Sequence, residues 1–130
     1  MKTYFADTNI FVRFFLKDDP AAVIRAKSYF AKVEKNQIKI VILSEIVLEI
    51  EYVLRKVYKT ECQDIANYLS ILLRAPYFEV EGRAFLEKAL ALYSKTNVDL
   101  VDVLLFVRAS QNNAEVLSFD KDFQKLAKLE

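Results

Sequence analysis

The sequence predicts an α/β domain with a short, mainly parallel sheet, because β-prone runs alternate with helical patterns along the chain. Its 130 residues fit one domain, residues 1–130. Apolar residues make up 54% of the chain, which is enough for a substantial core. In parallel sheets, functional groups gather at the carboxyl ends of the strands. The residues that follow each strand are therefore the first candidates for a site.

Four short runs rich in β-branched and aromatic residues predict the strands. The expected strands are residues 3–6, 39–43, 77–80 and 115–118. The second is the most apolar, which indicates a buried central position. The third follows Pro76, which ends the helix before it.

Helices are expected wherever apolar residues recur at helical spacing behind a capping residue. The expected helices are residues 10–16, 20–35, 44–58, 60–74, 82–94 and 99–112, with a terminal helix after residue 120. Asp7 caps the first, and Asp19 with Pro20 opens the second. Ser44 and Thr60 are expected to cap the two helices that they begin, and Asp120 the last.

Asp102 is the most informative residue, because its helix is apolar nearly all the way round. A helix of that kind is buried. An unpaired carboxylate there is costly, and the nearest charged residue on the same face, Asp99, is also acidic. A divalent cation is the simplest source of the missing positive charge.

Three further acids fall near strand ends. Asp7 follows the first strand, Asp120 lies two residues past the last, and Glu49 lies just over one turn into the helix after the second. Together with Asp102 they would converge at one edge of the sheet, where mutual repulsion raises their pKa values. Mg²⁺ or Mn²⁺ would relieve the repulsion, because either ion takes oxygen ligands. Asp7 and Asp120 each have an alternative role as a helix cap.

Several acidic positions keep two interpretations. Residues 96–99 match the [ST]-x-x-[DE] capping box, so Asp99 either holds the helix start or joins the site. Glu49 flanks the apolar stripe of its helix and is the best second acid, with Glu45 as the alternative. Glu51 is expected on the solvent side.

Composition excludes several kinds of chemistry. The chain has no histidine, which removes Ser-His-Asp and Cys-His catalysis and histidine zinc sites. The single cysteine, Cys62, makes no internal disulfide and fits a reducing, cytoplasmic location. No signal peptide is visible, and the apolar runs are too short to span a bilayer.

A net charge of +1 gives no overall attraction to nucleic acid, so a polyanionic substrate needs local basic residues. The candidates for phosphate contact are Arg13, Lys17, Arg55, Lys56 and Lys59. For any one of them, a solvated helix face is the simpler interpretation.

The order and spacing of the acidic motifs resemble the PIN-domain family, and within it the VapC-type toxin ribonucleases. The motifs are residues 6–9 (ADTN), 47–49 (VLE) leading to 52–54 (YVL), 98–102 (VDLVD) and 118–123 (SFDKDF). The resemblance runs from Asp7 to Phe123, although residues 59–95 carry no motif.

The resemblance implies a three-layer α/β/α domain that binds Mg²⁺ or Mn²⁺ and hydrolyses RNA phosphodiester bonds. By motif position, the metal ligands and catalytic acids would be Asp7, Glu49, Asp102 and Asp120, with Asn9, Asp99 and Ser118 in support. It also implies a homodimer, and a small antitoxin protein as partner. One metal or two is left open.

Two other functions are weighed against this one. A degenerate, non-catalytic PIN-like module for RNA or protein binding is the alternative, but all four acids are present. An aspartate-nucleophile phosphatase also uses a strand-end Asp and Mg²⁺. It fits poorly, because Asp7-Thr8-Asn9 lacks the Asp-x-Asp pattern.

Overall fold

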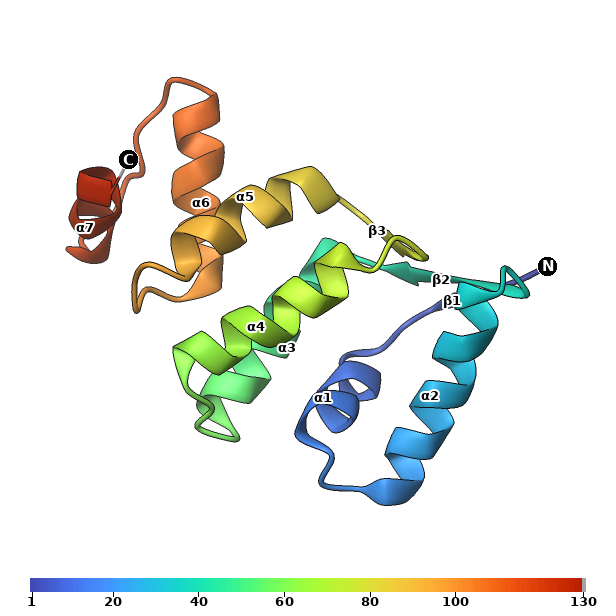
Figure 1. The fold of residues 1–130 in the computed structure, drawn as a ribbon. Helices are drawn as coiled ribbons and strands as arrows, with labels where there is room; N and C mark the ends of the chain where they lie inside the picture. The colour runs from blue at the N-terminus through green and yellow to red at the C-terminus, as the bar shows by residue number, and fades with distance from the viewer. Residues whose placement is uncertain (130) are drawn as a thin grey trace.

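Three parallel strands form the sheet, in the order β1-β2-β3 (Figure 1). In the computed structural model, which describes residues 1–129, they span Lys2–Phe5 (β1), Ile38–Ile42 (β2) and Phe78–Val80 (β3). Tyr4 is in register with Ile40, which is in turn in register with Phe78. The central strand is the most buried, as its apolar sequence predicts.

Seven helices accompany the sheet in the described residues. They are α1 (Thr8–Leu16), α2 (Pro20–Glu34), α3 (Ser44–Lys56), α4 (Cys62–Arg74), α5 (Arg83–Tyr93), α6 (Leu100–Gln111) and α7 (Asp122–Leu129). Asp7 caps α1, and Asp19 caps α2 by accepting a hydrogen bond from the Ala22 N–H at 3.2 Å. Ser44 and Thr60 are not the caps, because Leu43 and Glu61 hold those positions.

The helices pack in chain order along most of the molecule. α1 lies against α2 and α3, and from α3 onward each helix contacts the next, while α3 also contacts α6. In Figure 1, α6 and α7 lie at the end of the molecule away from β1. This arrangement confirms the α/β class with a short parallel sheet.

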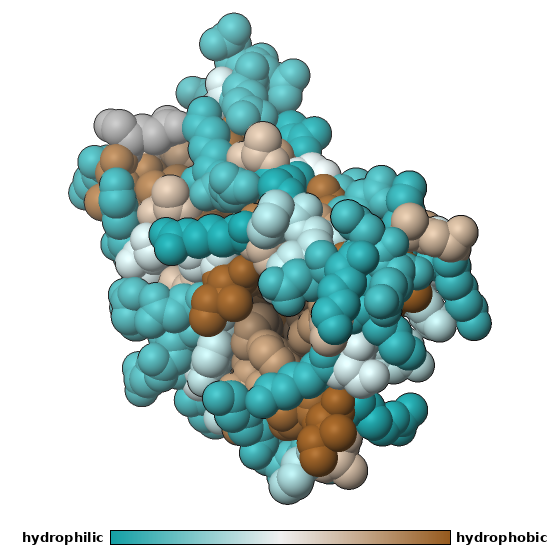
Figure 2. Space-filling view, turned by 45° about the vertical axis from the view of Figure 1, so that its right-hand side comes forward, coloured by the Kyte–Doolittle hydropathy of each residue, from teal (hydrophilic) through white to brown (hydrophobic). Residues whose placement is uncertain are grey.

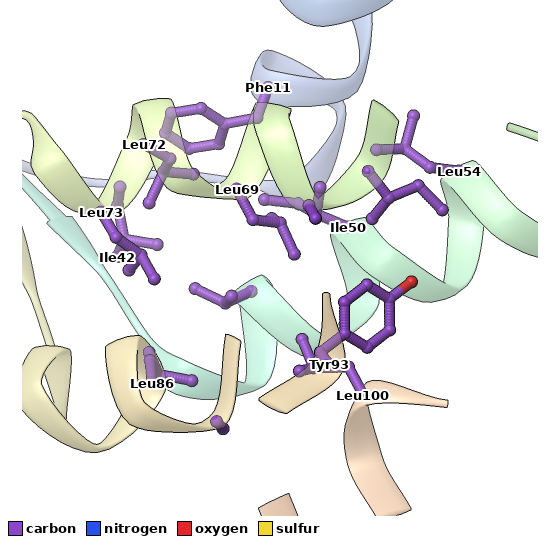
Figure 3. Packing of buried hydrophobic residues seen from close by; sticks show 14 of the residues in the cluster. Phe11, Ile42, Ile50, Leu54, Leu69, Leu72, Leu73, Leu86, Tyr93 and Leu100 are labelled. Atoms are coloured by element: carbon purple, nitrogen blue, oxygen red, sulfur yellow. The ribbon is translucent and has the colours of Figure 1, made fainter. Parts of the chain in front are cut away.

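One continuous core joins the strands to the helices (Figure 3). Ile42 of β2, Ile50 and Leu54 of α3 and Leu69 of α4 are completely buried. In α3 and α4, the helical spacing of the apolar residues places Ile50, Leu54 and Leu69 on the buried faces of their helices. Tyr93 of α5 is the largest fully buried side chain, and its hydroxyl is the polar group that Figure 3 shows among these apolar neighbours.

The predicted fourth strand, residues 115–118, is wrong for this structure. The stretch after α6 is neither helix nor strand, and its Leu117 and Phe119 side chains are fully exposed, at 102% and 108%. A strand needs a neighbour with which to pair. Here α7 packs against α6, so the connection between these helices stays at their end of the molecule, away from β1 (Figure 1).

Hydrophilic side chains cover most of the face that Figure 2 shows, and apolar side chains appear between them in its centre and lower part. Scattered apolar side chains of this kind are ordinary on protein surfaces. Within residues 1–129, no helix has the length and apolar character needed to cross a membrane.

Candidate metal centre

Three carboxylates meet where α6 approaches the start of α7. Asp102, Asp120 and Asp122 each offer a carboxylate oxygen, and these atoms lie within 4.8 Å of one another. Asp102 lies in the first turn of α6, Asp120 just before α7, and Asp122 is the first residue of α7. The packing of α7 on α6 therefore brings Asp102 together with two acids that lie 18 and 20 positions later in the chain.

Local hydrogen bonds hold the loop that carries Asp120. The Ser118 Oγ accepts a hydrogen bond from the Asp120 N–H at 2.9 Å, and the Asp120 Oδ1 accepts one from the Asp122 N–H, also at 2.9 Å. Asp120 therefore caps the start of α7, as expected. Ser118 lies where it supports the Asp120 backbone.

Electrostatics at the cluster favour a cation. Burial raises the pKa of Asp102 above its ordinary value, and the neighbouring charges of Asp99, Asp120 and Asp122 raise it further. The positive charge of Arg55 acts in the opposite direction. Several carboxylate oxygens this close together are the donor set that a hard divalent cation suits. On its other side, Asp122 pairs with the Lys125 Nζ at 3.3 Å.

Asp7 lies outside this cluster. Its Oδ1 accepts a hydrogen bond from the Thr8 N–H at 2.8 Å, which gives it the capping role that the sequence allowed. Asp7 and Asn9 line a pocket of about 230 Å³ together with Arg13 and Arg25. The first motif therefore lines a pocket with two arginines and with the apolar side chains of Ile10, Ala22 and Tyr29.

The three glutamates of α3 differ in their surroundings. Glu49 is exposed and lies outside the cluster of Asp102. Glu45 is also exposed and accepts a hydrogen bond from the Ser44 Oγ at 3.0 Å. Glu51, expected on the solvent side, is instead 2% exposed. It shares the buried face of α3 with Val47, one turn before it, so the expectation for Glu51 was wrong.

Glu51 belongs to a polar network behind the cluster. Its Oε2 accepts hydrogen bonds from the Arg55 Nε at 2.7 Å and from the Tyr93 hydroxyl at 3.0 Å. The Arg55 Nη1 lies 3.3 Å from the Asp99 Oδ1. Asp99 is the N-cap of α6, but its side chain caps no backbone N–H, so the expected capping box does not form. The Asp99 side chain pairs with Arg55 instead.

The basic residues expected to contact phosphate have different surroundings. Arg13 forms an ion pair with Asp18 at 2.8 Å, and Arg55 is held by Glu51 and Asp99. Lys17, Lys56 and Lys59 are exposed near the ends of their helices. Two of the five predicted contacts are therefore already engaged within the chain.

Two residues of the centre escaped sequence reasoning. Asp122 joins the cluster, and the Asp-x-Asp spacing of Asp120 and Asp122 is the signal that could have found it. Glu51 could have been found from Val47 and Leu54, which place it on the apolar stripe, and from Arg55 four residues later.

Comparison with known proteins identifies the family of the chain. The sequence model of the PIN domain family matches residues 4–129. A VapC ribonuclease from Aquifex aeolicus (strain VF5) is 31% identical over 121 residues, which cover 92% of this chain and 89% of that protein. No solved structure gives a significant match.

Proposed function

The chain belongs to the PIN domain family, and on that premise we propose that it is a metal-dependent endoribonuclease, the toxin of a toxin–antitoxin pair. Its helices and short parallel sheet are consistent with the three-layer α/β/α fold of that family. The likeness to a VapC ribonuclease along nearly the whole chain supports the choice of RNA as substrate.

The observation that carries the proposal is the cluster of Asp102, Asp120 and Asp122. These three side chains would hold Mg²⁺ or Mn²⁺, which supplies Lewis-acid activation of a water molecule and of the phosphodiester when it is bound. Because the chain has no histidine, either a carboxylate would take the proton of that water, or the activated water would need no side-chain base. Ser118 holds the Asp120 backbone through its hydroxyl.

The motif positions assign further residues to the same reaction. Asp7 and Glu49 are proposed as additional catalytic acids, with Asn9 beside Asp7 in its pocket and Asp99 next to Asp102 in the first turn of α6. Support for these roles comes from the order of the motifs along the chain. Mutation of each of these residues tests its role separately from the role of the three clustered carboxylates.

The remaining proposals concern the residues that contact RNA phosphates and the proteins that bind this chain. Exposed Lys17, Lys56 and Lys59 are proposed to contact the RNA backbone, and Arg13 faces the Asp7 pocket from α1. A small antitoxin protein and a second copy of this chain are the proposed protein partners, as the resemblance to VapC-type toxins implies.

The test compares RNA hydrolysis with and without Mg²⁺ or Mn²⁺ by the wild type and by Asp102→Asn, Asp120→Asn and Asp7→Asn. Each variant is expected to lose at least about 100-fold in activity, because replacing one interaction that stabilises the transition state commonly costs that much. Lys88→Gln, an exposed substitution on α5, is the control. Undiminished hydrolysis by Asp102→Asn would overturn the proposal, and a lack of both hydrolysis and metal binding in the wild type would favour a non-catalytic module.

A further inference from the structure

A buried carboxylate lies behind the acidic cluster, on a helix that contacts α6. Glu51 of α3 is 2% exposed, and its two oxygens accept hydrogen bonds from Arg55 and Tyr93. A well-packed apolar pair often gives at least as much stability as a buried ion pair. Stability alone therefore does not explain why this chain holds a charge at that position.

Arg55 connects the buried carboxylate to the surface. Its Nε and Nη2 face Glu51, at 2.7 and 3.4 Å, while Nη1 lies 3.3 Å from the Asp99 Oδ1. The guanidinium group is planar, so two contacts on one side fix the direction of the third. The side chain of Arg55 is 22% exposed and that of Asp99 43%, so the network runs from the core to the solvent.

Asp99 shares a turn of helix with the central ligand of the proposed metal centre. The Asp99 carbonyl accepts hydrogen bonds from the Asp102 N–H at 3.0 Å and from the Val103 N–H at 3.1 Å. Restraining Asp99 therefore restrains the backbone of Asp102. This turn is the part of α6 that must face Asp120 and Asp122 for the three carboxylates to meet.

We propose that Arg55 is a positioning residue of the metal centre, which acts through Asp99 and, within residues 1–129, forms no ion pair with any of the three clustered carboxylates. Anchored on Glu51 and Tyr93, it holds Asp99 and thereby orients the first turn of α6, so that Asp102 meets Asp120 and Asp122. The inference rests on the proposed function and gives Arg55 a role other than the RNA contact expected from its charge. Lysine cannot replace it, because an ammonium group has no planar fork with which to grip Glu51 and Asp99 together.

Titration calorimetry with Mn²⁺ tests this role through binding rather than turnover. Arg55→Lys keeps the charge and loses the fork, and we expect it to bind Mn²⁺ about tenfold more weakly than the wild type, the usual cost of losing a partner of a metal ligand. Arg74→Lys, the same change at an exposed site on α4, is the matched control and should bind like the wild type. Glu51→Gln removes the anchor by a second route and should weaken binding in the same direction.

A double-mutant cycle shows whether Arg55 acts through Asp99. Once Asp99→Asn is present, adding Arg55→Lys should change the Mn²⁺ affinity by less than about twofold. Additive effects would overturn the inference, as would wild-type affinity in folded Arg55→Lys and Glu51→Gln. If Arg55→Lys shows no cooperative melting and is therefore unfolded, the Mn²⁺ affinity of Glu51→Gln decides whether the inference holds. Absence of saturable Mn²⁺ binding in the wild type would instead remove the proposed metal centre, and this inference with it.

Discussion

The Tyr93 hydroxyl oxygen lies 3.0 Å from the Glu51 Oε2, and both side chains are buried. Burial raises the pKa of Tyr93 well above its ordinary value, and the negative charge of Glu51 raises it further. Tyr93 therefore keeps its proton throughout the physiological range, and its hydroxyl donates a hydrogen bond to Glu51. This contact ties α5 to α3 at the point where α3 also reaches α6.

Removing the cationic partner of Glu51 should destabilise the fold strongly. Arg55→Leu leaves a buried carboxylate without its counter-charge, and we expect a loss of about 3–5 kcal/mol in the free energy of unfolding, measured with urea. The double variant Glu51→Leu with Arg55→Leu should return to within about 1 kcal/mol of the wild type, because no charge is then left buried. Equal stability of the single variant and the wild type would show that Glu51 is hydrated.

Asp102→Asn should stabilise the metal-free protein at neutral pH. The pKa of Asp102 is raised in the fold, so its contribution to stability is present below its ordinary pKa and is lost as pH rises through the raised value. Ionised Asp102 therefore opposes folding at pH 7, and Asn removes that penalty. Thermal melts in EDTA between about pH 3 and pH 7 should show a higher melting temperature for Asp102→Asn at pH 7, with the difference shrinking toward acid.

Added Mn²⁺ should reverse that order. Metal that binds only the folded state raises its melting temperature, so the wild type should gain stability at pH 7 and Asp102→Asn should gain little. The gain should diminish as pH falls, because protons compete with the metal for the carboxylates. If Asp102→Asn were less stable than the wild type in EDTA at pH 7, the ionised Asp102 carboxylate would not oppose folding as its raised pKa implies.

Two positions on α4, one buried and one exposed, should differ in their response to truncation. Leu69 is completely buried, and Leu69→Ala should cost about 2–5 kcal/mol through lost burial and the cavity left behind. Ile71, on the same helix, is 59% exposed, and Ile71→Ala should change stability by no more than about 0.5 kcal/mol. Urea unfolding of both variants measures the contrast, and similar losses would mean that α4 is rotated about its axis.

The stretch between α6 and α7 should tolerate polar substitution. Phe119 has no cover in this structure, so Phe119→Ser should leave the free energy of unfolding within about 0.5 kcal/mol of the wild type. Leu117→Ser should behave in the same way. A loss above about 2 kcal/mol in either variant would indicate that residues 115–118 pair as the strand that their sequence pattern predicts.

Local patterns were sufficient for most of the architecture. Capping by Asp7 and Asp19, the apolar run of β2 and the stripe of α3 each specify an element without reference to the rest of the chain. The strand at 115–118 failed because strand propensity does not name a pairing partner. That partner depends on where α6 and α7 pack, which is a property of the whole fold.

The candidate site was only partly within reach of the sequence. Asp102 and Asp120 meet because α7 packs on α6, whereas Asp7 and Glu49, predicted to converge with them, lie outside the cluster. Asp122 was missed because it resembles an ordinary first-turn acid, and only its spacing from Asp120 sets it apart. The hydrogen bond from Tyr93 to Glu51 could not be predicted, because it depends on how α5 packs. Tyr93 also lies in a stretch of the sequence without a motif.

The exposed connection between α6 and α7 is also accessible to proteases. Leu117 and Phe119 offer large side chains to a chymotrypsin-like protease, in a stretch without secondary structure. One cleavage there would place Asp120 and Asp122 on a short peptide held only by the packing of α7 on α6, with Asp102 on the larger fragment. Dissociation of that peptide would remove two of the three clustered acids while every strand of the sheet remained intact.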